Sequence, residues 1–261
     1  MYEHHAAAIE NITEKLKARK DILGIIVGGS VAHGFAGEDS DIDLMLVLSE
    51  QDYADRLKSG QLTYFETEAC SYDGGYVDAK YTSLSFIGKV AESGSEPARF
   101  AYKDAFVSYS EIEGLEQLIA QASRYPVEKK QENVRRFYAQ FEAWKWYCQE
   151  GLRKNNRYLI DFSASNFILF GGRLILAYNE TLYPYQKWFL KVLESVGKKP
   201  DSLLRCINEL LEHKNQDTVE QLYRCIVDFN KWPPDDRHWA SQFMLDSELN
   251  WLSGQVPIAD I

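Results

Sequence analysis

Residues 28–48, GGSVAHGFAGEDSDIDLMLVL, contain the side chains whose types and spacing could do chemistry. Two glycines and Ser30 follow a buried apolar run, and main-chain N–H groups in such a turn at a helix start can hold a phosphate. Asp41 and Asp43 open the next apolar run, so strand alternation puts both carboxylates on one face. Two like charges beside an apolar strand are costly unless a cation neutralises them. We therefore expect a hard dication, which prefers oxygen ligands.

A third carboxylate is Asp78, which lies in the predicted strand 75–82 with apolar neighbours on both sides. Lys80 falls on the same face, within reach of a phosphate, although an ordinary surface lysine is the competing interpretation. Three carboxylates can hold two metal ions, one activating an attacking hydroxyl and one binding a triphosphate. The alternative for the aspartates is a solvated strand edge. The two glycines and serine upstream favour the functional interpretation.

Two other motifs, one that binds phosphate and one that binds a cation, are each excluded because one required residue is missing. Residues 29–34 have the glycine spacing of a P-loop, but Phe35 stands where that motif needs lysine. An EF-hand loop from Asp39 to Glu50 has carboxylates at the right positions, but Leu44 replaces its required glycine. Neither motif explains the segment.

The elements that must position these residues divide the chain into two halves. The first half alternates between strand and helix patterns, with a helix after Ser49 as N-cap. We predict helices over 6–20, 49–58 and 83–93, and strands over 22–27, 42–48, 62–68, 75–82 and 105–109. His4 and His5 are expected at a mobile terminus. This pattern predicts an α/β or α+β domain with a mixed sheet over residues 1–115.

The second half, residues 116–261, has helical periodicity throughout and predicts an all-α helical bundle. Helices are expected over 129–153, 158–179, 184–196, 200–213, 216–231 and 237–252, with Pro233 and Pro234 as punctuation. The aromatic series from Phe137 to Tyr147 has core spacing, which we favour over a role in ligand stacking. Gly171 and Gly172 inside a helix indicate close helix packing.

Bulk properties exclude several function classes. The 261 residues carry a net charge of −10, which is poorly suited to a general nucleic-acid binder. No apolar run is long enough to span a membrane and no secretory signal is recognisable, so a cytoplasmic protein without membrane contact is expected. The four scattered cysteines predict free thiols and no zinc site. The sequence indicates no particular oligomeric state.

The ordered combination of Gly28-Gly29-Ser30, then Asp41-Ile42-Asp43, then Asp78 in a later strand resembles the signature of the DNA polymerase β-type nucleotidyltransferase superfamily. The resemblance covers roughly the first 110 residues. It implies transfer of a nucleoside monophosphate from an NTP, expected to be ATP, with release of pyrophosphate. It also implies two Mg²⁺ ions on the three catalytic aspartates. The nucleotide-binding residues that we expect are Gly28, Gly29, Ser30 and Lys80.

The helical half resembles that of antibiotic (aminoglycoside or lincosamide) adenylyltransferases, through residues 173–179 and 182–188. This resemblance implies a small-molecule acceptor hydroxyl and a glutamate base, for which Glu142 and Glu180 are candidates. Two alternatives stay open: adenylylation of a protein partner of the toxin–antitoxin type, and a catalytically silent nucleotide-binding module. Template-directed polymerisation is disfavoured by the negative charge.

Overall fold

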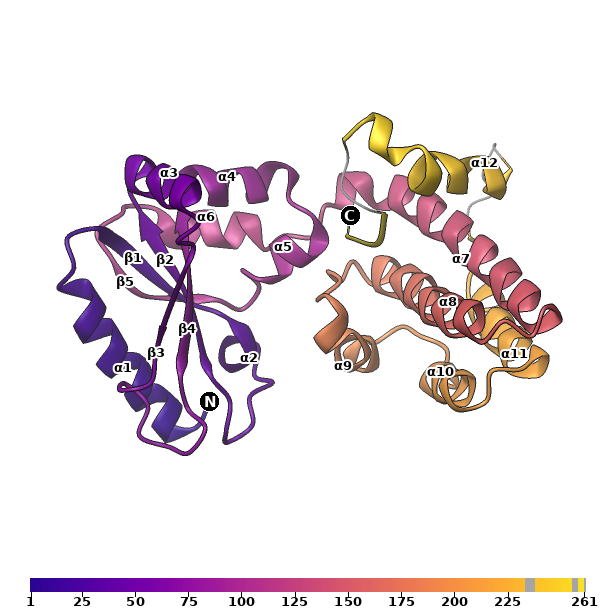
Figure 1. Ribbon diagram of the computed structural model, residues 1–261, viewed down its shortest axis with the longest axis horizontal. Helices are drawn as coiled ribbons and strands as arrows, with labels where there is room; N and C mark the ends of the chain where they lie inside the picture. Colours follow the sequence, from indigo (N-terminus) through magenta and orange to yellow (C-terminus); the bar gives the residue numbers. More distant parts are fainter. Residues whose placement is uncertain (233–237, 255–257, 261) are drawn as a thin grey trace. The chain divides into compact units, whose positions relative to one another are not determined.

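The computed structural model describes residues 1–232, 238–254 and 258–260, and the chain forms two compact units, Met1–Arg124 and Tyr125–Ile261 (Figure 1). The first unit is a mixed sheet with helices, and the second is helical, as the sequence predicts. The units divide after helix α6 (Leu115–Ala122), whose Leu115 and Ile119 belong to the core of the first unit. A boundary after residue 115 would cut this helix from the sheet that it covers.

The N-terminal unit is built on a five-stranded sheet of order β3-β4-β2-β1-β5. Strands β2 and β4 pair in parallel, and the other three pairs are antiparallel. The sheet is therefore mixed. Its strands are β1 (Ile22–Val27), β2 (Ile42–Leu48), β3 (Thr63–Glu66), β4 (Val77–Ser83) and β5 (Phe106–Ser110). Each strand begins within two residues of its predicted first residue.

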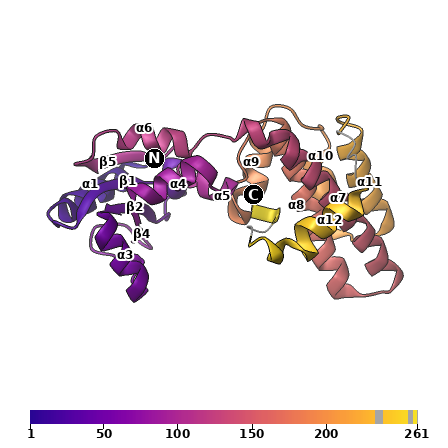
Figure 2. The same cartoon turned by 90° about the horizontal axis from the view of Figure 1, so that it is seen from above.

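Helices pack on both faces of the sheet, and Figure 2 shows this unit from above. Helix α1 (Glu3–Lys17) buries its apolar stripe against one face, where alternate residues of β2 and β4 are fully buried. On the other face, α4 (Leu84–Ser93) and α6 pack over Ile26 and Val47. The short helices α2 (Gly29–Ala32), α3 (Glu50–Ser59) and α5 (Glu96–Phe100) complete the unit. Alternation in β2 thus puts Ile42 and Leu44 on the face that α1 covers, and puts Asp43 on the same face as Val47.

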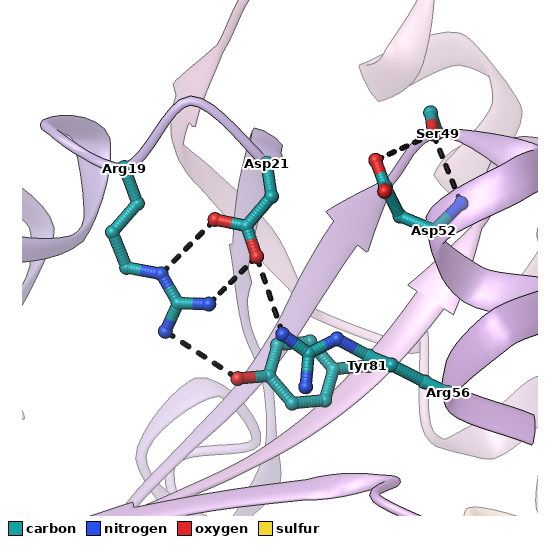
Figure 3. Close-up of polar contacts among 6 residues, drawn as sticks. All are labelled: Arg19, Asp21, Ser49, Asp52, Arg56 and Tyr81. Atoms are coloured by element: carbon teal, nitrogen blue, oxygen red, sulfur yellow. Dashed lines mark hydrogen bonds and ion pairs between the residues drawn. The ribbon is translucent and has the colours of Figure 1, made fainter. Parts of the chain in front are cut away.

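A polar network ties the start of β1 to α3 and β4 (Figure 3). Arg19 donates two hydrogen bonds to Asp21, at 3.1 and 2.7 Å, and Arg56 donates a third at 3.2 Å. The Arg56 guanidinium lies 3.7 Å from the ring centroid of Tyr81. Ser49 caps α3 as predicted, because its hydroxyl accepts from the Asp52 amide at 3.1 Å.

The predicted mobile terminus is instead part of α1. His5 is completely buried and His4 Nε2 lies 2.8 Å from the Glu38 carbonyl oxygen. Both imidazoles contact the ring of Tyr72, whose hydroxyl donates to the Ser40 carbonyl at 2.7 Å. Burial lowers the pKa of His5. The first turn of α1 therefore packs against the loop that leads into Asp41, a long-range contact with no local sequence signal.

The C-terminal unit is built around two long helices, α7 (Lys130–Arg153) and α8 (Arg157–Tyr178), which pack along each other. The rest of the unit is α9 (Phe189–Ser195), α10 (Leu203–Glu212), α11 (Gln216–Val227) and α12 (Trp239–Phe243). Short 3-10 and π turns flank them: η1 (Val127–Lys129), η2 (Gln186–Trp188), η3 (Met244–Glu248), η4 (Asn250–Leu252) and η5 (Ile258–Asp260).

Two helices predicted for this unit are broken in the structure. The segment 184–196 begins with the turn η2 before α9, since Tyr185 adopts a left-handed φ of 71°. The segment predicted over 237–252 is divided into α12, η3 and η4. Residue 237, Pro233 and Pro234 lie outside the described residues.

Close packing explains the paired glycines of α8, as expected. A Cβ atom on Gly172 would lie 2.3 Å from the Phe189 ring, and one on Gly171 would lie 2.9 Å from the Phe141 ring. Phe137 and Phe141 are fully buried, which matches the predicted core role of this series. Helix α8 is long and apolar enough to cross a membrane by length and composition, yet 61% of its most apolar window is buried inside the protein. Burial of that kind is typical of a core helix.

Candidate active site

The two predicted strand carboxylates lie side by side in the sheet. Asp43 of β2 and Asp78 of β4 are direct partners in the parallel register, so their side chains project from the same face. Both residues are partly exposed, whereas their strand neighbours Ile42 and Val77 are fully buried. The pairing therefore places two partly exposed carboxylates next to each other near the start of β2 and β4.

Asp41 directly precedes β2, and the next residue, Ile42, donates its amide to the Tyr76 carbonyl at 2.9 Å. The negative charges of all three carboxylates act on the Tyr76 hydroxyl. The charge of Asp41 raises the pKa of Tyr76 most, aided by hydrogen bonding between the two side chains, and Asp43 and Asp78 act in the same direction. Tyr76 thus shares its surroundings with the three predicted aspartates. The only sequence signal for Tyr76 is its position two residues before Asp78, which by alternation puts it on the same face.

The turn after β1 packs directly against Asp43. The Gly28 amide donates to the Asp43 carbonyl at 3.0 Å, which fixes the end of β1 beside β2. Gly29 has a left-handed φ of 61°, and a Cβ atom there would lie 1.7 Å from Oδ2 of Asp43. Glycine is required for both reasons, since a side chain would be strained and would occupy the carboxylate's position.

Ser30 is buried in the first turn of α2, with 4% of its surface exposed. Its hydroxyl has no hydrogen-bond partner within the portion of the chain that the structure describes. The first amides of a helix also lack acceptors inside the helix. This short turn therefore combines donors of the kind that hold an anion, next to Asp43.

Lys80 lies one step further along the same face. It is exposed and pairs with Met45 of β2 and Thr63 of β3 in the sheet register. Alternation from Asp78 puts its ammonium group on the face that carries the carboxylates. The geometry agrees with a phosphate contact and equally with a surface lysine, so its role stays a prediction.

The donor chemistry of this site suits a hard divalent cation. Carboxylate oxygens are the ligands that Mg²⁺ prefers, and Asp43 and Asp78 stand on paired positions with Asp41 nearby. Across residues 1–232, 238–254 and 258–260, however, no three His, Cys, Asp or Glu side chains stand grouped as ready ligands of a metal ion. Metal ligation by the three aspartates therefore stays a prediction.

The candidate bases in the helical unit have other partners. Glu142 accepts a hydrogen bond of 2.8 Å from the Tyr223 hydroxyl. Glu180 forms an ion pair of 2.8 Å with Lys130 and has a left-handed φ of 52°. These contacts account structurally for both glutamates, and neither is assigned a catalytic role.

Comparison with known proteins finds a family match within the N-terminal unit. Residues 9–121 match the family model described as "Nucleotidyltransferase domain". A comparison with curated protein sequences finds no match. The fold is similar to a nucleotidyltransferase-like protein from Exiguobacterium sibiricum 255-15, with 10% identity and a TM-score of 0.47 over 95% of this chain and 79% of that chain. A likeness at this level carries no information about activity.

Proposed function

Because residues 9–121 of this chain form a nucleotidyltransferase domain, we propose that the protein transfers AMP from ATP to a hydroxyl group of a small molecule. Pyrophosphate is the second product. The observation that carries the proposal is the pairing of Asp43 with Asp78, with the backbone of Gly29 held against the Asp43 carboxylate. A phosphate-binding turn and a pair of carboxylates are thereby brought to one end of the sheet.

Different residues along the sheet bind the phosphates and the metal ions in the proposed reaction. The amides of the turn from Gly28 to Ser30 and the Ser30 hydroxyl bind the β- and γ-phosphates, and Lys80 adds a positive charge. Asp41, Asp43 and Asp78 would hold two Mg²⁺ ions, which lower the pKa of the acceptor hydroxyl and neutralise the charge on the leaving pyrophosphate. Asp43 lies between the turn and Asp78, so it is the carboxylate shared by both halves of the site.

The reaction is an in-line substitution at the α-phosphorus. The acceptor oxygen forms a bond to this phosphorus, and the bond to the oxygen that bridges to the β-phosphorus breaks. The acceptor hydroxyl proton passes to solvent or to a base, and pyrophosphate leaves with the electron pair of the broken bond. With a net charge of −10, the protein favours a cationic acceptor, and a cationic antibiotic is the class that we propose.

The test is transfer of label from each α-³²P-labelled NTP, with Mg²⁺, to a panel of hydroxyl-bearing small molecules that includes aminoglycosides and lincosamides. Asp43→Asn and Asp78→Asn should lose transfer, whereas Asp201→Asn, at an exposed position of the helical unit, should retain it. Label on one small molecule, lost in both site variants, would establish the activity. Label on a copurifying protein instead would replace the small-molecule acceptor by a protein.

Absence of transfer to every acceptor, with ATP binding intact, would contradict the proposal and identify a nucleotide-binding module. Transfer that survives in both asparagine variants would exclude the carboxylate pair as the reaction centre. Replacement of Mg²⁺ by excess chelator should abolish transfer in the wild-type protein.

A further inference from the structure

An aromatic pair, the exposed Phe65 and the partly buried Tyr76, flanks the carboxylates on the side away from the turn from Gly28 to Ser30. Phe65 of the edge strand β3 is the direct partner of Asp78 in β4. Its side chain is 63% exposed, the highest value for an aromatic residue in the N-terminal unit. The Phe65 ring centroid lies 5.4 Å from that of Tyr76, and the two planes are tilted by 36°.

The position of this pair is more informative than its exposure, since single exposed aromatic residues are common on protein surfaces. Directly opposed residues of antiparallel strands project from the same face, so Phe65 stands on the face that carries Asp78. Tyr76 links the aromatic pair to Asp41 through its hydroxyl. The apolar surface is therefore continuous with the acidic site.

The order of the strands assigns this surface to one substrate. The turn from Gly28 to Ser30 follows β1, and the order from β1 through β2 and β4 to β3 places Asp43, Asp78 and Phe65 successively further from it. In an in-line substitution the attacking oxygen and the leaving pyrophosphate lie on opposite sides of the α-phosphorus. Pyrophosphate at the turn therefore puts the acceptor on the side of β4 and β3.

We propose that Phe65 and Tyr76 form the acceptor-binding surface and stack against the ring of a hydroxyl-bearing cyclic compound, such as a sugar or cyclitol. Aromatic faces pack against the C–H faces of saturated rings such as sugars and also attract cations, so amino groups on the acceptor add to its affinity. Stacking would hold one ring hydroxyl beside Asp78. This inference rests on the proposed transfer of AMP and names the class of acceptor.

The test compares the wild-type full-length protein with Phe65→Ala, Phe65→Tyr and Phe106→Ala. Phe106 is the matched control, since it is a 38% exposed phenylalanine on β5, the opposite edge strand of the same sheet. The first measurement is the affinity for ATP with Mg²⁺ by calorimetry. We expect equal affinity in all four proteins. An affinity for ATP that falls roughly tenfold in Phe65→Ala, the loss typical of one stacked base, would overturn the proposal and assign the surface to adenine.

The second measurement is the KM for kanamycin A and for lincomycin in the label-transfer assay. In Phe65→Ala we expect this KM to rise roughly tenfold with the KM for ATP unchanged, and Phe65→Tyr and Phe106→Ala to match the wild type. The same KM in Phe65→Ala and the wild type would overturn the proposal while leaving the proposed transfer intact.

If neither compound receives label, saturation-transfer NMR of both compounds with Mg-ATP present supplies the readout, with open-chain sorbitol as the comparison ligand. Binding of a ring compound that is lost in Phe65→Ala, with no saturation transfer to sorbitol, would support the ring-binding surface independently of the proposed transfer. No binding of either ring compound to the wild type would overturn the inference.

Discussion

The backbone of Gly29 lies directly against the carboxylate of Asp43, so that a Cβ atom on this glycine would sit 1.7 Å from the Oδ2 atom. The turn after β1 and the first residues of β2 therefore cannot be changed independently. A nucleotide phosphate held by this turn and a metal ion held by Asp43 would be placed relative to each other by one non-bonded contact.

Gly29→Ala is expected to abolish transfer by displacing the Asp43 carboxylate. A misplacement of about 1 Å at a reacting centre can cost roughly a hundredfold in rate. The left-handed φ adds about 1–2 kcal/mol of strain. Gly60→Ala is the control, since Gly60 has a φ of 73° and nothing within 4 Å of its would-be Cβ. Label transfer and thermal melting would be measured for both. An equal loss of activity in the two variants would mean that backbone strain alone is responsible.

Asp78→Asn is expected to uncouple the stability of the N-terminal unit from Mg²⁺. Without metal, removing one of two opposed like charges should stabilise the unit by roughly 0.2–1 kcal/mol. With Mg²⁺ at about one hundred times its Kd, the wild type should gain about 2.7 kcal/mol, and the variant much less. Calorimetric melting with Mg²⁺ and with chelator checks this. An identical Mg²⁺ response in both proteins would show that Asp78 binds no metal.

Asp21→Asn is expected to destabilise the N-terminal unit at neutral pH. Hydrogen bonding from Arg19 is the main cause that holds the pKa of Asp21 below its ordinary value of 3.8. A depressed folded-state pKa contributes stability above pH 3.8, and that contribution disappears as the pH falls through the folded-state pKa. With a third of the side chain exposed, a loss of about 1 kcal/mol is expected.

Urea denaturation of the wild type and Asp21→Asn over a pH series measures this difference. The difference in free energy of unfolding between the two proteins should be constant near neutral pH. It should become smaller only below about pH 4. A difference in unfolding free energy that grows in acid would contradict the assignment of Arg19 as the partner of Asp21. Asp55→Asn is the comparison, since Asp55 is an exposed carboxylate of α3 that lies 3.7 Å from Lys58. This substitution should lower the free energy of unfolding less than Asp21→Asn.

Gly172→Ala is expected to destabilise the helical unit despite the better helix propensity of alanine. The new methyl group would lie 2.3 Å from the Phe189 ring, and such overpacking typically costs about 1–3 kcal/mol. Phe189→Leu should relieve part of this cost, so the double variant should be more stable than the two single effects predict. Gly197→Ala, with open space around it, is the control. Additive effects in the cycle would rule out the contact as the cause.

Helix and strand positions followed largely from local patterns. Strands 22–27 and 42–48 and the Ser49 cap were predicted at their observed positions, because apolar runs, alternation and capping depend on near neighbours in the chain. The short helices α2 and α5 were missed, since four or five residues contain too little periodicity. The placement of His5 was wrong because its burial depends on Tyr72 and the loop before Asp41.

The sequence by itself pointed to the candidate site residues and predicted on which side of each strand they project. Alternation predicts that Asp41 and Asp43 share a face, although β2 begins only at Ile42, and Gly29 follows a strand that must turn. The tertiary structure alone decided that β2 pairs with β4 in parallel, in the register that opposes Asp43 and Asp78. It also placed Phe65 opposite Asp78 and brought the rings of Phe65 and Tyr76 together. Register is a long-range property, since a slip of one residue moves every side chain to the other face without altering any local pattern.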